Sequence, residues 1–366
     1  MELTSRTLLD NPFLEELQDP EVKAAYADDP YFSDEEDDAR VRADLFRNRP
    51  MGINELLQHF GLFGTTGSGK TMSAARILEN YAELDVAFTC WDYEATSFYT
   101  IPEVFPQVQF KRLEPLLNDE TYGEYLANST SKENKPFFSN YLKQLDFRKV
   151  PECQEKLAKI EEMAEKNYLT SQKTILSMED IPDDLMRCCI AYTYTMHIFK
   201  LANALKEKEA QLLHVNFFDE AHWAVPWYGS VEWTIYTSKL LDCLKRIATM
   251  GRKRWLILGI ASQRLPQINP DVRTQLQNVI LLKASPQDLW HYEGFMKNLP
   301  MGARKALSGK ALHMPAGQAM FVQNGWVNPN LWVVKRKSRH TDTNASYFKA
   351  RARADKSRVE FYGDAK

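Results

Sequence analysis

The sequence has 366 residues, of which 44% are hydrophobic and 26% are charged, and its formal net charge is −3. A chain of this length can bury a core of its own, and it lacks a run of about 20 apolar residues of the kind that spans a membrane. The five cysteines form neither a CxxC pair nor a Cys/His ligand pattern, which argues against a disulfide framework or a zinc site. We therefore expect a globular, cytoplasmic protein without membrane insertion.

The two ends of the chain differ in charge. Residues 1–60 hold fifteen carboxylates and six Lys or Arg, whereas residues 331–366 hold four carboxylates and ten Lys or Arg. Residues 1–50 have no long apolar period and are predicted to form an acidic irregular arm, and residues 341–366 are predicted to form a basic tail. The tail could neutralise nucleic-acid phosphates or dock on a neighbouring subunit's acidic arm, and both interpretations stay open.

From His59 onward, short apolar runs alternate with helical patterns. HFGLF leads into a glycine-rich segment and an amphipathic helix, VAFTCWDYE is a second strand, and a charged, mostly helical segment fills residues 100–210. LLHVNFFDE, WLILGIASQ and NVILLKAS then alternate with helical stretches, as in a doubly wound parallel sheet. We therefore predict an α/β domain over residues 51–340 with a helical insertion at about 100–210.

The strongest motif lies between the first predicted strand and helix, where residues 64–71 read GTTGSGKT and fit G-x-x-x-x-G-K-[ST]. Its glycines let backbone N–H groups line a cup at a helix N-terminus, which favours the phosphates of ATP. Lys70 would bridge the phosphates, and the Thr71 hydroxyl would bind Mg²⁺. The predicted nucleotide-binding residues are Gly64, Thr65, Thr66, Gly67, Ser68, Gly69, Lys70 and Thr71.

A phosphate loop needs a carboxylate for the metal, and the run VNFFDE supplies two at the end of a predicted strand. Asp219 would hold Mg²⁺ through water, and Glu220 would polarise the attacking water as general base. The letters DEAH at 219–222 name a family of RNA helicases with two tandem RecA-like domains. This chain has one phosphate loop and too few residues after NVILLKAS for a second such domain.

Downstream of these acids, the chain resembles the HerA/FtsK superfamily of DNA-pumping ATPases. The matching patterns are KRIATMGRK, then IASQR, then PQINPDV, and finally the strand LWVV with its basic exit. They lie at residues 245–253, 260–264, 266–272 and 331–340. The resemblance covers residues 55–100 and 210–340, and it implies a RecA-like (ASCE) P-loop core.

The resemblance also implies roles for residues outside the phosphate loop. Gln263 matches the family's sensor, whose amide can contact the γ-phosphate and the attacking water. Arg246 and Arg252 are both candidates for an arginine finger that reaches a neighbour's nucleotide, and the sequence does not choose between them. Lys253 and Arg254 could contact DNA phosphates, although such a pair also commonly caps a helix C-terminus.

These roles predict an ATP-hydrolysing ring motor, by analogy a homo-hexamer, that translocates double-stranded DNA with an active site shared between subunits. The phosphate loop begins at residue 64, so we do not expect the N-terminal β-barrel of full-length HerA. Genome packaging or DNA transfer would fit such a motor, with a portal, capsid, nuclease or secretion protein as partner and a location in the host cytoplasm or on a virion. The alternative is a nucleotide-switched assembly or partner-recruiting ATPase without translocation.

Overall fold

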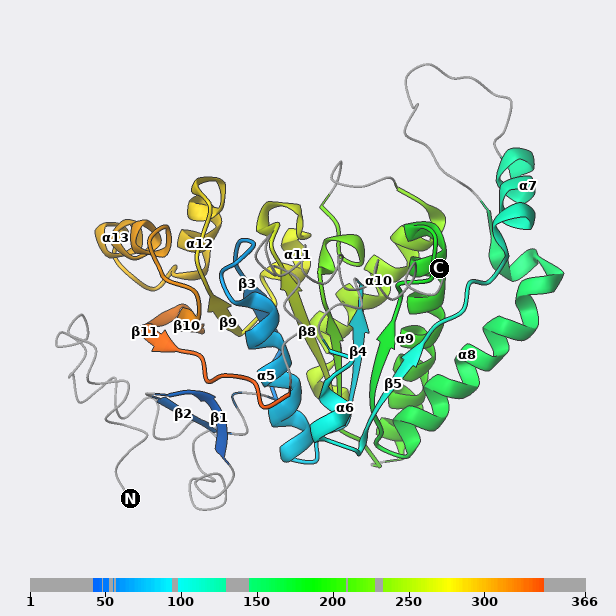
Figure 1. Ribbon diagram of the computed structural model, residues 1–366, viewed down its shortest axis with the longest axis horizontal. Coiled ribbons are helices and arrows are strands. Elements are labelled where there is room, and N and C mark those ends of the chain that lie inside the picture. Colours follow the sequence, from blue (N-terminus) through cyan, green and yellow to red (C-terminus); the bar gives the residue numbers. More distant parts are fainter. Residues whose placement is uncertain are drawn as a thin grey trace, which may run out of the picture.

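A nine-stranded sheet forms the centre of the protein, in the order β11-β10-β9-β3-β8-β7-β4-β6-β5 (Figure 1). The computed structural model describes residues 42–47, 49–52, 55, 57–93, 98–129, 145–208, 210–227 and 233–338. The strands from β9 to β5 run parallel, and β10 and β11 are antiparallel. The predicted basic tail and residues 1–41 of the predicted acidic arm lie outside the described residues. The prediction that the arm is irregular up to residue 50 is wrong, because Arg42–Phe46 pairs antiparallel with Arg49–Gly52.

The strands are β1 (Arg42–Phe46), β2 (Arg49–Gly52), β3 (Phe60–Phe63), β4 (Phe88–Asp92), β5 (Val108–Arg112), β6 (Lys173–Ser177), β7 (His214–Phe218), β8 (Leu256–Ser262), β9 (Asn278–Leu281), β10 (Gln318–Gln323) and β11 (Trp326–Trp332). The helices are α5 (Lys70–Glu83), α6 (Ile101–Val104), α7 (Asp119–Ser129), α8 (Pro151–Leu169), α9 (Asp184–Glu207), α10 (Ile235–Met250), α11 (Pro270–Arg273), α12 (Leu289–Phe295) and α13 (Met301–Ala311). None of the helices in the described ranges is long and apolar enough to cross a membrane.

The strand order confirms the predicted α/β class with a RecA-like core, because β8 is inserted between the phosphate-loop strand β3 and the acid-bearing strand β7. The pairing register sets the ends of these strands level. Phe63 pairs with Ser262, and Phe218 pairs with Ile260. The residues that follow β3, β7 and β8 therefore all leave the sheet at its carboxyl edge.

Both faces of the sheet are covered, which explains why its parallel strands read as continuous apolar runs. All residues of β3, β4, β6, β7, β8 and β9 are buried. One core contains the apolar sides of α5 and α6 together with β1, and the other contains those of α8, α9 and α10. α5 is thus held against the sheet through Ile77, Leu78 and Tyr81, which fixes the helix that follows the phosphate loop.

Residues 100–210 differ from the purely helical insertion that the sequence predicts. They contain α7, α8 and α9, but they also supply β5 and β6, which extend the parallel sheet beyond β4. Each of the two strands has five residues and lies among long charged helical stretches. Such short runs give little period-2 signal, so the helical pattern of their neighbours dominates the sequence.

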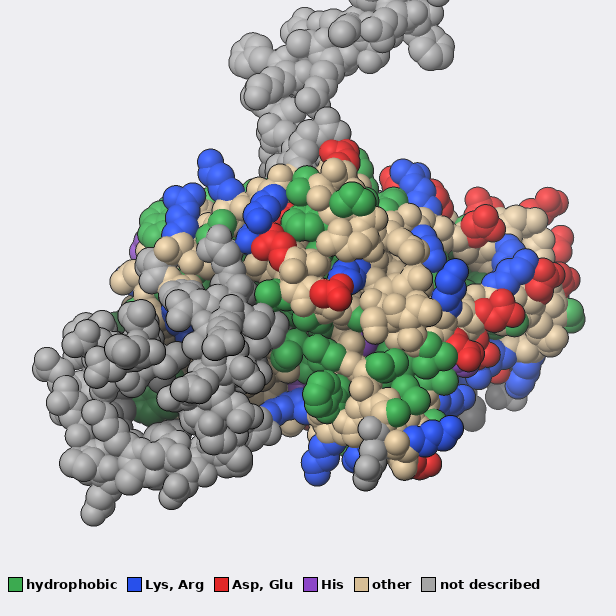
Figure 2. Space-filling view, turned by 90° about the horizontal axis from the view of Figure 1, so that it is seen from below, with side chains coloured by type: hydrophobic (Ala, Val, Ile, Leu, Met, Phe, Trp, Pro, Cys, Tyr) green, Lys and Arg blue, Asp and Glu red, His purple; other side chains and the backbone are tan. Residues whose placement is uncertain are grey.

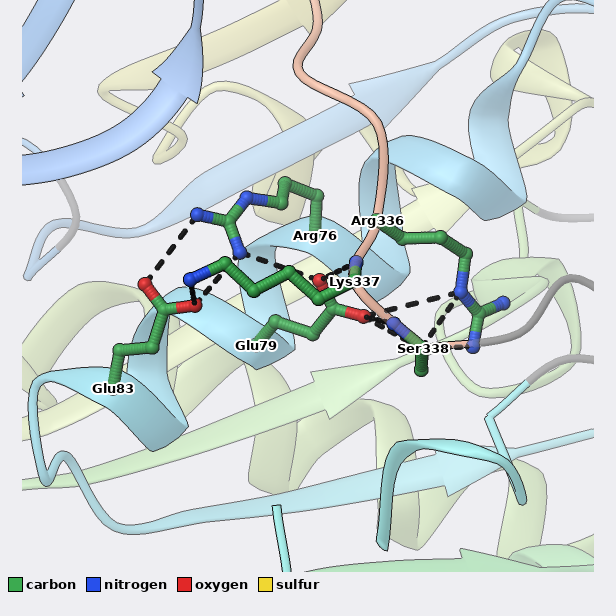
Figure 3. Close-up of polar contacts among 6 residues, drawn as sticks. All are labelled: Arg76, Glu79, Glu83, Arg336, Lys337 and Ser338. Atoms are coloured by element: carbon green, nitrogen blue, oxygen red, sulfur yellow. Dashed lines mark hydrogen bonds and ion pairs between the residues drawn. The ribbon is translucent and has the colours of Figure 1, made fainter. Parts of the chain in front are cut away.

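After β11, the chain crosses α5 as a segment that we call the strap, residues 333–338 (Figure 1). It is fixed by Glu79, whose carboxylate accepts hydrogen bonds from the backbone N–H of Lys337 at 2.7 Å and of Ser338 at 2.9 Å (Figure 3). Arg76 Nη1 lies 3.3 Å from the same carboxylate, and Arg336 Nε lies 4.0 Å from it. Because Glu79, Arg76 and Arg336 are buried, this ionic network ties the C-terminal segment to the phosphate-loop helix.

Candidate functional site: a nucleotide-hydrolysis centre

The phosphate loop lies at the carboxyl edge of the sheet, between β3 and α5 (Figure 1). Gly67 and Gly69 have φ angles of 77° and 95°, in the left-handed region that favours glycine. At Gly64, a Cβ atom would lie 2.6 Å from Ser68 Oγ and 2.7 Å from Leu282 Cβ. The loop therefore has room for glycine only at Gly64 and needs its backbone freedom at the other two positions, as expected of a phosphate cradle.

The lysine of the phosphate loop (the Walker A motif) and the two acids that follow β7 (the Walker B motif) come together beside this loop. Lys70 Nζ lies 2.5 Å from Glu220 Oε1 and 3.6 Å from Asp219 Oδ1. The three side chains are only 7% to 8% exposed. Lys70, at the start of α5, and Glu220, 150 positions later and after β7, thus meet in one charged cluster at the carboxyl edge of the sheet.

The backbone after β7 makes a sharp turn that aims the two acids. Glu220 has φ 45° and ψ 44°, a left-handed conformation that costs a non-glycine residue roughly 1–3 kcal/mol. Trp223 supports the turn, because its Nε1 donates to the Asp219 carbonyl oxygen at 3.2 Å and its side chain is buried. The sequence analysis did not assign Trp223 this role, and its position in the turn directly after the acids is the signal that could have indicated it.

Glu220 is ionised in this arrangement. Burial alone would raise the pKa of its carboxyl group, but the nearby His222 imidazole and the positive charge of Lys70 outweigh burial and lower the pKa to about 2. His222 Nδ1 lies 3.6 Å from Glu220 Oε2. As long as Lys70 stays beside it, Glu220 is a weak base, so a ligand that draws Lys70 away would raise its pKa and strengthen it.

Gln263 lies beside the same cluster, at the tip of β8. Its Oε1 accepts a hydrogen bond from Thr66 Oγ1 at 2.7 Å, and its backbone N–H lies 3.4 Å from Glu220 Oε2. It therefore touches both the phosphate loop and the Walker B acid. The predicted sensor position is one from which an amide can contact a phosphate and a water together.

The predicted arginines and the adjacent lysine lie elsewhere. Arg252, Lys253 and Arg254 follow α10 and precede β8, so they lie at the amino edge of the sheet. The seven residues of β8 span about 23 Å, which separates them from their own chain's phosphate loop. Arg246 is exposed near the C-terminal end of α10. Neither finger candidate adjoins the nucleotide site of its own subunit.

Arg254 is engaged inside the molecule. Its guanidinium donates to Met250 O at 2.9 Å and to Asn203 Oδ1, and its Cζ lies 5.4 Å from the centre of the Phe199 ring. These contacts join α9 to the end of α10. They favour the helix-capping interpretation of this basic pair for Arg254, whereas Lys253 is exposed.

Two cations that the sequence analysis left unassigned lie next to the phosphate loop. Arg264 follows Gln263 directly and is exposed. Lys283 is also exposed, and its carbonyl oxygen accepts from Thr65 N at 2.9 Å. Both follow the end of a parallel strand closely, and this shared position is the signal that could have indicated them.

The oxygen donors at the site suit Mg²⁺, which typically takes one or two carboxylates together with nucleotide phosphates. Asp219 supplies a carboxylate beside the loop, and Thr71 supplies a partly exposed hydroxyl on the first turn of α5. Within the described ranges, no three His, Cys, Asp or Glu side chains gather into a group that could hold a metal ion by themselves. The metal would therefore be bound jointly with the nucleotide.

No model of a known protein family matches the chain, and no curated protein matches its sequence. Solved structures that resemble it include the genome packaging NTPase B204 from Sulfolobus turreted icosahedral virus 2, with 12% identity and a TM-score of 0.42 over 76% of this chain and 99% of B204. VirB4 of Thermoanaerobacter pseudethanolicus has 14% identity and a TM-score of 0.44 over 78% of this chain and 91% of VirB4. The bacterial conjugative coupling protein TrwBdeltaN70 has 12% identity and a TM-score of 0.47 over 84% of this chain and 94% of its own.

The likeness is distant, with identities of 14% or less and TM-scores below 0.5. What this protein does must therefore be inferred from its own residues.

Proposed function

We propose that the protein is an ATP-hydrolysing motor that forms a ring and translocates double-stranded DNA, with each active site completed by a neighbouring subunit. The observation that carries the hydrolysis is the convergence of Lys70, Glu220 and Gln263 at one end of the sheet. The DNA substrate is supported by the motifs after β7, which resemble those of DNA-pumping ATPases.

Each residue has a distinct part in this proposal. Lys70 leaves Glu220 and binds the β- and γ-phosphates, which frees the carboxylate and raises its pKa. Glu220 then accepts a proton from the attacking water, and Gln263 orients that water against the γ-phosphate. Asp219 and Thr71 would hold a Mg²⁺ ion, which would neutralise charge on the phosphates.

Sharing of the site is supported by where the finger candidates lie. Arg252 is at the amino edge of the sheet, about a strand's length from its own phosphate loop, so it can stabilise transition-state charge only in another subunit. A head-to-tail ring brings unlike edges of successive subunits together, and such closed heterologous assemblies are a common form of symmetry. Arg246 lies near the C-terminal end of α10, close to Arg252 in the sequence, and is the second candidate for the arginine finger.

Steady-state ATPase activity measured with and without long double-stranded DNA tests the proposal. We expect DNA to raise the rate of the wild-type protein, and the Glu220→Gln variant to turn over roughly 10²- to 10⁴-fold more slowly than wild type in either condition. A wild-type rate that is measurable but unaffected by DNA would contradict translocation and favour the nucleotide-switched assembly ATPase.

A further inference from the structure

The C-terminal part of the described chain carries positive charges and no negative side chains. Residues 294–338 contain seven Lys or Arg and no Asp or Glu. The two carboxylates just before this stretch are engaged: Asp288 accepts from Ser285 Oγ at 2.6 Å, and Glu293 accepts from Ser308 Oγ at 3.0 Å. The helical hairpin α12–α13 therefore presents positive charge without an exposed, unengaged carboxylate of its own.

Three lysines of the α12–α13 hairpin are exposed, namely Lys297 between the two helices and Lys305 and Lys310 on α13. We call them the hairpin lysines. Trp290 of α12 is 75% exposed on the same hairpin. Acidic side chains gather instead at the other end of the sheet, toward α8 (Figures 1 and 2), where Glu155 and Glu162 are exposed. The end of the sheet toward α8 thus carries the exposed carboxylates that the hairpin lacks.

The hairpin is joined directly to the phosphate loop. Tyr292 of α12 donates its O–H to the carbonyl oxygens of Phe63 at 3.2 Å and Leu282 at 3.3 Å, at the end of the strand that leads into the loop. After α13, Gly317 N donates to Ser68 O, a carbonyl of the loop itself, at 3.0 Å. A ligand that moves the hairpin would therefore pull on the nucleotide site through the Tyr292 hydroxyl and through the backbone bond of Gly317.

We infer that the hairpin lysines bind the sugar-phosphate backbone of double-stranded DNA, and that the α12–α13 hairpin is the surface through which DNA acts on the ATPase centre. This inference rests on the proposed function, because it names where the motor's substrate is held. A polyanion fits the surface because exposed lysines that outnumber the carboxylates of the hairpin lower its energy by releasing counterions. The alternative pair at the amino edge is less suited, since Arg254 is already held by Asn203, Met250 and Phe199.

The test compares two triple variants that change the net charge equally. One is Lys297→Ala/Lys305→Ala/Lys310→Ala, and the matched control is Lys166→Ala/Lys200→Ala/Lys206→Ala, which removes three exposed lysines from α8 and α9. Binding of a fluorescent duplex is measured by anisotropy at several salt concentrations. We expect the hairpin variant to lose about tenfold or more in affinity and its logarithmic salt slope to fall by about 2 to 3, while the control stays within about twofold of wild type.

The outcomes separate this inference from the proposed function. A wild-type protein that binds no duplex overturns both. A wild-type protein that binds duplex with a hairpin variant equal to it overturns the hairpin surface alone. ATPase activity without DNA and oligomeric state by light scattering are measured in parallel, and both should match wild type. If the hairpin variant instead dissociates into single subunits that bind DNA with normal affinity, the surface is a subunit contact and the inference is wrong.

Discussion

Lys70 and Glu220 form an ion pair in which each restrains the other. Replacing Lys70 with alanine removes the cation that grips the phosphates, so the Lys70→Ala variant should lose nucleotide binding or hydrolysis. Glu220→Gln leaves the phosphate cradle intact and releases Lys70, so it should bind ATP at least as tightly as wild type and yet turn over roughly 10²- to 10⁴-fold more slowly. Titration with a fluorescent ATP analogue and a phosphate-release assay separate the two effects. Normal turnover by Glu220→Gln would refute the Walker B assignment.

His59, just before β3, predicts an acid-sensitive step in stability. Its Nδ1 accepts a hydrogen bond from Leu258 N at 2.9 Å, and burial together with the charge of Arg252 lowers its pKa to about 4. The unfolded chain therefore takes up this proton first, near pH 6.5, so the native state loses stability as pH falls from 6.5 toward 4. At pH 5 the loss from His59 is about 2 kcal/mol.

The variant His59→Asn keeps an acceptor oxygen near Leu258 but cannot be protonated. Urea unfolding at pH 7 and pH 5 should show a drop in unfolding free energy that is smaller by about 2 kcal/mol in the variant than in wild type. His214, whose buried imidazole has its pKa lowered to about 3, contributes equally to both proteins and cancels. An identical drop in the two proteins would contradict the role given to His59.

At the scale of single residues, the sequence predicts best where a motif encodes backbone geometry. The glycines of the phosphate loop indicate backbone angles that other residues rarely adopt, and the structure has such positive φ angles at Gly67 and Gly69. The contact between Thr66 and Gln263 is not visible in the sequence, because it depends on β8 lying beside β3. The contacts of Arg254 with Asn203 and Phe199 were likewise hidden, since these two partners come from α9, some fifty residues earlier, whereas its bond to Met250 O fits the capping alternative.

At the scale of elements, the strap should contribute to stability through its buried network. Removing the carboxylate with Glu79→Ala leaves Arg76 and Arg336 with less compensation and strips the strap of its acceptor, which should cost about 3–5 kcal/mol. Lys337→Ala serves as the control, because its Nζ pairs with Glu83 at 2.9 Å but its side chain is 53% exposed, and it should cost less than about 1 kcal/mol. Equal unfolding midpoints in urea for the two variants would show that the network does not hold the strap.

Element prediction succeeded for apolar runs that are bounded by motifs or turns, and it failed for strands enclosed by charged, helical sequence. The succession of β3, β4, β7, β8 and β9 along the chain follows from the alternation of apolar runs and helical patterns. β5 and β6 were hidden because five-residue strands between charged helices resemble parts of those helices. The antiparallel edge formed by β10 and β11 depends on which strands pair, and a sequence pattern does not state that.

At the scale of the whole molecule, a site shared between subunits can be tested by mixing. Arg252→Ala should bind ATP normally and hydrolyse it about 10³-fold or more slowly, because the group it lacks stabilises the neighbour's transition state. Mixing it with Lys70→Ala, which retains the arginine, should rebuild composite sites and restore part of the activity. The same design applies to Arg246. Unimpaired hydrolysis by both arginine variants, or mixed assemblies without any rescue, would mean that each subunit completes its own site.

Two backbone hydrogen bonds join the end of β1 to the end of β11 and the start of the strap, and they have a mechanical consequence. Arg47 N donates to Trp332 O at 2.9 Å and Val334 N donates to Leu45 O at 2.8 Å, so the two segments run side by side on α5. A pulling force applied through residues before β1 and after the strap would load the bonds of Glu79 to the strap and these two hydrogen bonds before it reached the central sheet. These segments lie on α5, the helix that begins at Lys70. Tension on the chain ends and occupancy of the phosphate loop would therefore act on the same helix.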